Sequence, residues 1–157
     1  MNQFRVIVTS IAVASTLVMG GCAAGPDATP TATATPTPSV SVDPWGPAPE
    51  YFPKGTASQN KPLFDWALGQ AVLQDMKDPG KAMVKALAKV GFDKESMQVT
   101  KSKTGTGGPA DAVTVSVKFG KICLIGQRFL NWSYYSSVEA VMSTGNCLIG
   151  QTREINW

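Results

Sequence analysis

The chain has 157 residues, a net charge of +3 and no histidine, and these numbers exclude several classes of protein. Without histidine the chain lacks the commonest general base and the usual zinc ligand, which argues against an enzyme and against a bound metal or cofactor. The charge falls to +2 once residues 1–21 are set aside, because Arg5 is their only charged residue. So small a charge does not indicate a nucleic-acid-binding surface. The 43% hydrophobic content favours a folded domain over a disordered chain.

The N-terminus has the pattern of an export signal. Arg5 precedes an apolar run over residues 6–19. As a helix this run would span about 21 Å, less than the roughly 30 Å hydrocarbon core of a membrane. We therefore predict a signal peptide at residues 1–21 rather than a permanent membrane span.

Cys22 follows this signal directly, after Gly20 and Gly21. The sequence Val-Met-Gly-Gly-Cys at 18–22 resembles the lipobox of bacterial lipoproteins, although Met19 stands where that family usually has Leu. The resemblance implies cleavage before Cys22, lipidation of its thiol with diacylglycerol, and acylation of the new amino terminus, for example with palmitate. The protein would then be anchored by lipid to the extracytoplasmic face of the cell membrane. Ordinary secretion, with Cys22 free or removed, is the alternative.

Lipidation of Cys22 would leave Cys123 and Cys147 as an even pair in an oxidising compartment. Each begins a copy of the sequence Cys-Leu-Ile-Gly-Gln, and the copies are displaced by 24 residues. We interpret the copies as neighbouring strands, antiparallel by preference although parallel pairing stays open. Neighbouring strands would bring the two Cα atoms within the distance that a disulfide requires. A structural disulfide is therefore predicted.

Residues 22–60 are rich in Pro, Thr, Ala, Ser and Gly and cannot form a core. Their prolines favour an extended linker that holds the folded domain away from the membrane. A platform for O-glycosylation on the threonines is a further reading of this segment. Trp45, Tyr51 and Phe52 are unusual in such a linker, and their rings can dock back on the domain.

The folded domain, residues 61–157, is expected to begin with two helices. Pro62 suits a first helical position, and the apolar residues that follow predict a largely buried helix over 62–75. Asp78 and Pro79 form an N-cap and first-position pair, and an apolar stripe after them ends at Gly91. A second helix is predicted between Asp78 and Gly91.

After Phe92 the apolar periodicity changes from that of a helix to that of strands. Strands are predicted at 97–101, 113–119 and 122–129, the last two joined by a type II′ turn at Gly120-Lys121. We further predict a short helix over 138–142, capped by Ser137, and a final strand from about 146. The expected fold is α+β: two N-terminal helices packed on a mostly antiparallel sheet of about four strands, with a short helix before the last strand.

These features together resemble an uncharacterised family of actinobacterial envelope lipoproteins, a domain of unknown function. The resemblance rests on the lipobox, the Pro/Thr linker, the two Cys-Leu-Ile-Gly-Gln copies and the C-terminal sequence from Cys147 to Trp157. It implies a cellular location and no activity.

The acidic residues of the domain are scattered one per element, so no carboxylate pair is spaced for catalysis. The best candidate site is the segment from Arg128 through the predicted loop 129–135, because aromatic rings stack on sugars or fill partner pockets. The candidate binding residues are Arg128, Trp132, Tyr134 and Tyr135. The alternative is that Trp132 and one tyrosine only close the end of a small core.

We therefore expect a non-enzymatic binding or interaction module, displayed outside the cytoplasmic membrane. It would contact an envelope protein or a wall glycan, with no nucleic acid partner, no cofactor and no metal. The alternatives are a structural or assembly accessory without its own ligand, and a small hydrolase that works without histidine.

Overall fold

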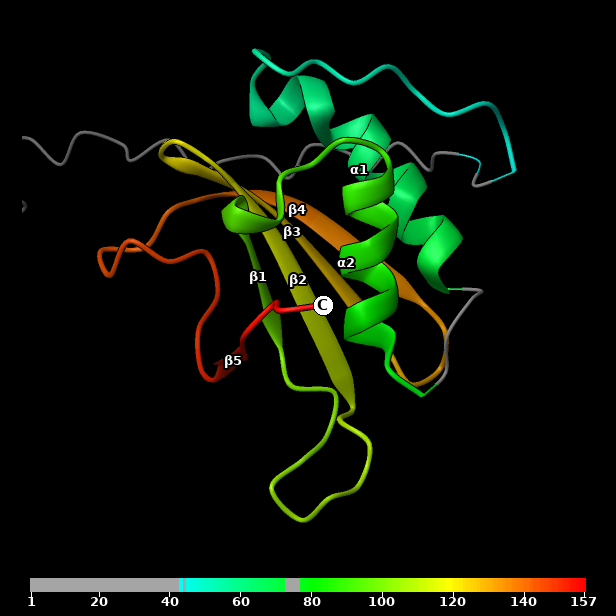
Figure 1. Ribbon diagram of the computed structural model, residues 1–157, viewed down its shortest axis with the longest axis vertical. Helices are drawn as coiled ribbons and strands as arrows, with labels where there is room; N and C mark the ends of the chain where they lie inside the picture. Colours follow the sequence, from blue (N-terminus) through cyan, green and yellow to red (C-terminus); the bar gives the residue numbers. More distant parts are fainter. Residues whose placement is uncertain (1–42, 44, 73–76) are drawn as a thin grey trace, which may run out of the picture. The chain divides into compact units, whose positions relative to one another are not determined.

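The computed structural model of the protein describes residues 43, 45–72 and 77–157; the predicted signal peptide and Cys22 lie outside this range. The described chain is an α+β fold, as predicted, in which two helices lie on one face of a five-stranded antiparallel sheet of order β4-β3-β2-β1-β5 (Figure 1). In chain order the elements are α1 (Ala57–Val72), α2 (Pro79–Lys89), the 3-10 turn η1 (Lys94–Ser96), β1 (Met97–Thr100), β2 (Ala112–Phe119), β3 (Ile122–Phe129), β4 (Tyr134–Ala140) and β5 (Thr152–Arg153).

Helix α1 begins at Ala57, five residues before its predicted start, so the prediction that Pro62 opens the helix was wrong. A reciprocal cap starts it: the Gln59 amide donates to Oγ1 of Thr56, and the Thr56 amide donates to Oε1 of Gln59. Pro62 lies in the second turn of the helix, where its missing N–H leaves the carbonyl of Ser58 without its helical donor.

Residues before α1 also contact the domain. The Trp66 indole donates to the carbonyl of Gly46, and the Tyr51 ring packs edge-on against Phe92. The contacts of the described chain therefore reach back into the segment predicted as linker. Of the three aromatic residues there, Tyr51 packs on the core, whereas Trp45 is 77% and Phe52 is 37% exposed.

Helix α2 confirms the local signals of the sequence. The Asp78 side chain accepts a hydrogen bond from the amide of Lys81, and Pro79 occupies the first helical position. Gly91 follows the helix with a φ of +108°, which favours glycine. The core lies between the two helices and the near face of the sheet, where Val99, Val115 and Leu124 are fully buried.

The central hairpin of the sheet also agrees with the prediction. Phe119 pairs with Ile122 across the turn, and Gly120 has a φ of +60° while Lys121 does not have a positive φ, as a type II′ turn requires. The predicted helix over 138–142 was wrong, because this region belongs to strand β4. Seven residues of β4 pair with β3, so sheet hydrogen bonds override the local helix signal of Ser137.

The predicted disulfide is present: Cys123 is bonded to Cys147, with Cα atoms 5.8 Å apart. The two copies of Cys-Leu-Ile-Gly-Gln are nevertheless not neighbouring strands, because the second copy precedes β5, and β5 pairs with β1 at the other edge. Cys123 points to the face opposite the helices, where Cys147 and Leu148 cover it. The disulfide therefore fixes an irregular segment across the back of the sheet.

Candidate ligand-binding site

The hairpin between β3 and β4 forms one end of the sheet. Its four turn residues are 130–133, and the turn is closed by hydrogen bonds from the Phe129 amide to the Ser133 carbonyl and from the Trp132 amide to the Phe129 carbonyl. Asn131 supports it, since its Oδ1 accepts from both the amide and the hydroxyl of Ser133. Trp132 has a φ of +70° and is the only non-glycine residue with a positive φ in the described chain.

Large apolar side chains are exposed around this hairpin. Leu130 is 52%, Trp132 is 45% and Tyr135 is 57% exposed. Tyr135 pairs with Gln127 and so lies on the sheet face opposite the helices. The hairpin therefore carries apolar surface that the described chain does not cover.

Arg128 lies just before the turn, on the face toward the helices, where it pairs with Val113 of β2 and Tyr134 of β4. It is only 7% exposed, and its Nε has no hydrogen-bond partner. The guanidinium carbon lies 5.0 Å from the centre of the Trp132 ring, a cation–π distance. Within the described residues no carboxylate pairs with Arg128.

A cavity of about 180 Å³ lies beside Arg128. Four segments line it: the end of β3 with Leu130, the loop 102–110, Val113 of β2, and the N-terminal end of α2 with Lys77 just before it. Among the described residues, the charged residues of the lining are Lys77, Lys103 and Arg128, and none of the described lining residues is acidic. The described lining therefore carries positive charge.

Tyr134, the remaining candidate, belongs to β4 and not to the turn, and its ring packs against the core. Burial, helped by the charge of Asp65, raises the pKa of Tyr134 above its ordinary value of 10.0. Its phenol therefore stays protonated at neutral pH. The structure thus brings Arg128 and Trp132 together, places Tyr134 in the core and puts Tyr135 on the opposite face.

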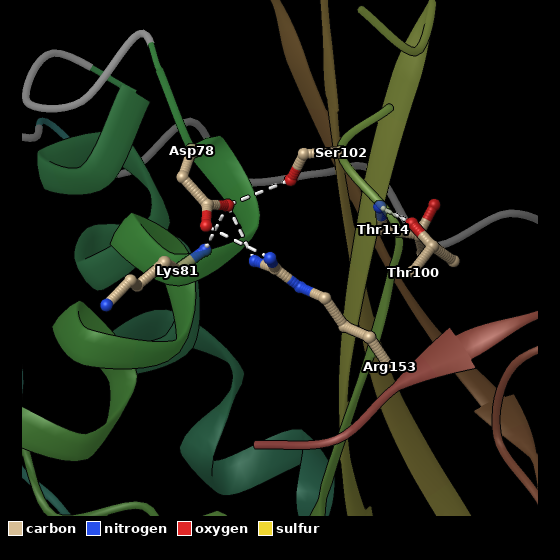
Figure 2. A network of polar contacts seen from close by, with 6 residues as sticks. All are labelled: Asp78, Lys81, Thr100, Ser102, Thr114 and Arg153. Atoms are coloured by element: carbon tan, nitrogen blue, oxygen red, sulfur yellow. Dashed lines mark hydrogen bonds and ion pairs between the residues drawn. The ribbon is translucent and has the colours of Figure 1, made fainter. Parts of the chain in front are cut away.

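A polar network holds the walls of the cavity in place (Figure 2). Besides capping α2, the Asp78 carboxylate accepts hydrogen bonds from Ser102 at 2.9 Å and from both terminal nitrogens of Arg153, at 2.6 and 3.0 Å. Burial opposes ionisation of Asp78, but the hydrogen bonds from Arg153, Lys81 and Ser102 outweigh it and lower its pKa below 3.8. This network joins α2 to β5 and to the loop that lines the cavity.

A second polar cluster joins α1 to the edge strand β4. Nζ of Lys61 lies 2.6 Å from Asp65 and 2.8 Å from the hydroxyl of Ser136, and that hydroxyl donates to the Asp65 carboxylate. A serine next to a lysine can serve as a nucleophile when the lysine is neutral. Here Lys61 forms an ion pair with Asp65, and Ser136 is 7% exposed. The cluster therefore ties α1 to β4.

Comparison with known proteins assigns a family. Residues 68–151 match the family described as a domain of unknown function (DUF6993). The chain belongs to this family. No curated protein and no solved structure matches the chain.

The part of the chain that matches DUF6993 runs from within α1 to just before β5, so it contains Arg128, Trp132 and both disulfide cysteines. Lys61, Asp65 and Arg153 lie outside it. Among the described residues of this DUF6993 protein, no group of three or more acidic or cysteine side chains could hold a metal ion. None of its described helices is long and apolar enough to cross a membrane.

Sequence reasoning missed two parts of the site. The lining contributed by Lys103 and Pro79 depends on tertiary contacts that no local pattern encodes. The same holds for Ser136, which lies 75 residues from Lys61 in the sequence. Of this cluster, only the Lys61–Asp65 pair was predictable from the sequence, because residues four apart on a helix are neighbours.

Proposed function

We propose that this DUF6993 protein is a lipid-anchored module that binds a wall glycan outside the cytoplasmic membrane and carries out no catalysis. The lipobox-like sequence at 18–22 and the Pro/Thr linker support the location. The Cys123–Cys147 disulfide supports it too, because such bonds persist in oxidising compartments.

The backbone of Trp132, together with its exposure, carries the proposal. A left-handed backbone at a bulky residue costs roughly 1–2 kcal/mol. Here the strain does not serve to bury the ring, since 45% of Trp132 remains exposed. A strained backbone that leaves so much of an aromatic ring exposed is typical of binding sites, where a ligand completes the contact.

The dimensions of the site favour a glycan over a protein partner. A stable protein interface buries about 800 Å² on each side and has a broad apolar centre. The hairpin instead offers two exposed rings, Trp132 and Tyr135, and a cavity of about 180 Å³ beside Arg128. Such a surface suits the stacking of a sugar ring and the insertion of one small group.

The test is retention of the full-length protein on isolated cell walls. Trp132→Ala and Tyr135→Ala should reduce retention about tenfold, whereas Trp45→Ala should not, because Trp45 is an exposed tryptophan away from the hairpin. Equal retention of all three variants and the wild type would contradict the proposal. Retention of the wild type on envelope proteins but not on purified walls would favour the protein partner instead.

The anchor requires its own experiment. The Cys22→Ser protein should not be cleaved before residue 22 and should carry no diacylglycerol, which mass spectrometry of the N-terminal peptide measures. An unmodified Cys22 in the wild-type protein would refute the anchor without affecting the glycan proposal.

A further inference from the structure

The guanidinium of Arg128 is buried without an anionic partner. The other described arginine, Arg153, is paired through both terminal nitrogens with Asp78. Arg128 is less exposed, and its guanidinium lies beside the Trp132 ring with no acidic partner among the described residues. The Nε atoms of both arginines are buried without a hydrogen-bond partner. A buried charge in this condition is costly, because water has been removed and nothing has replaced it.

The surroundings of Arg128 favour an anion. Lys103 and Lys77 line the same cavity, and Asp78, the acid of the network described above, is engaged by Arg153 and Ser102. The Trp132 ring lies over the guanidinium of Arg128. The N–H groups of Arg128 point outward in the guanidinium plane, so the ring does not use them. This arrangement leaves a fork of donors for a planar or tetrahedral oxyanion.

We infer that the cavity binds an oxyanion, a carboxylate or a phosphate, carried by the wall glycan, with Arg128 as its main ligand and Lys103 beside it. This inference rests on the proposed function and specifies the group that the glycan inserts. The cavity, about 180 Å³, is smaller than the 300 Å³ or more of pockets that enclose whole drug-sized ligands. It therefore suits a single charged group, while the rest of the polymer contacts the exposed rings.

The inference makes a prediction that separates binding from folding. Because Arg128 has no acidic partner among the described residues and its buried charge is costly, Arg128→Gln should not lower the melting temperature of the full-length protein. It should weaken binding of inorganic phosphate or acetate at least about tenfold, since it removes the charge-assisted donors. A lower melting temperature together with unchanged anion binding would overturn the inference.

The experiment is calorimetric titration of the full-length protein in detergent with sodium phosphate and with sodium acetate, at constant ionic strength. Lys103→Gln serves as the second pocket variant, because Lys103 is exposed and its replacement should not affect folding. Lys85→Gln is the matched control, since it removes one exposed positive charge from α2 outside the cavity lining. Loss of binding in Arg128→Gln and Lys103→Gln but not in Lys85→Gln would support the inference.

The two anions identify the chemistry of the group: tighter binding of phosphate indicates a phosphate-bearing polymer, and tighter binding of acetate indicates a carboxylate. Binding of neither anion would overturn the inference. If wall retention then still depended on Trp132, the proposed function would stand without the oxyanion. If the wild type bound phosphate through Arg128 but was not retained on walls, the proposed function would fail while the anion site remained.

Discussion

Replacing Gly126 by alanine tests how closely α1 approaches the sheet. A Cβ atom at Gly126 would lie 2.2 Å from Cδ1 of Leu68 and 3.1 and 3.2 Å from ring atoms of Phe64. Leu68 and Phe64 are 1% and 0% exposed, so neither side chain can move into solvent. Either α1 must shift away from β3 or Leu68 must leave its preferred rotamer.

The expected loss follows from two opposing effects. Overpacking a core typically costs about 1–3 kcal/mol, and the upper end applies because carbon atoms prefer separations of about 3.5–4.0 Å. Replacing a strand glycine by alanine also stabilises the fold by about 0.5–1 kcal/mol, because it lowers the conformational entropy of the unfolded chain. We therefore expect Gly126→Ala to lower the free energy of unfolding by about 2 kcal/mol. For a domain of this size, that is a fall in melting temperature of roughly 8–16 °C.

Urea unfolding followed by circular dichroism measures this change. Gly105→Ala is the matched control, because a Cβ there would meet no atom within 4 Å and Gly105 has no positive φ. In the double variant Leu68→Ala/Gly126→Ala, the added methyl group enters space vacated by Leu68. Its destabilisation should fall short of the sum of the single changes by about 1 kcal/mol. A Gly126→Ala protein as stable as Gly105→Ala would refute the close approach of α1 to β3.

Two further predictions concern the ties that hold the sheet to its surroundings. Because the folded-state pKa of Asp78 is lowered from 3.8, its ionisation stabilises the fold above that pH, and this stability is lost as the pH falls through the lower value. Asp78→Asn keeps a capping side chain but cannot ionise, so its melting temperature should fall less between pH 5 and pH 2 than that of the wild type. A profile identical to that of the wild type would contradict the ion-pair role of Asp78. Replacing both Cys123 and Cys147 by alanine removes the closure of a segment of 24 residues and should cost about 3.5 kcal/mol, with faster proteolysis of the segment 141–151. Cleavage confined to the helices would contradict this assignment.

The predictions that held depend on short-range signals. The Asp78–Pro79 cap and Gly91 define both ends of α2 within a few residues of chain. Gly120 supplies the positive φ that a type II′ hairpin needs, and the alternation of β2 specifies which of its faces is buried. In each case the residues that decide the structure are neighbours in the sequence.

The predictions that failed had competing signals. Pro62 alone predicts a helix start, although the reciprocal pair of Thr56 and Gln59 marks an earlier one. Ser137 alone predicts a helix cap, yet its strand is held by pairing with β3 that the local sequence does not reveal. In the candidate site, the residue types at 128 and 132 were identifiable, but their contact depends on the left-handed turn at Trp132, for which glycine would be the usual signal.

The internal repeat illustrates why identical sequences received different structures. Gly126 lies in a paired strand beneath α1, where only a glycine avoids Leu68. Gly150 has a φ of +88° and no atom within 4 Å of an added Cβ, so its role is conformational and not steric. The first copy is held by strand pairing on both sides, whereas the second crosses the back of the sheet and leads into β5, at the edge opposite β4. The repeated Cys-Leu-Ile-Gly-Gln sequence therefore predicted the disulfide correctly and the strand pairing incorrectly.

The two ends of the sheet differ in the contacts that their surface segments make. Near the β2–β3 turn, Lys118 donates to the Gly145 carbonyl, and Gln98 accepts from the amides of Cys147 and Leu148, so these bonds hold the covering segment on the sheet. At the opposite end, the buried Arg128 has no acidic partner among the described residues, and Trp132 is strained and exposed. Other buried polar atoms also lack a partner, in Ser116, Arg153 and Trp157, but within the described chain only the hairpin combines an unpaired buried guanidinium with a strained, exposed ring. Such a combination of costs is typical of a binding site. For this reason the hairpin end, and not the disulfide end, is where a ligand should act.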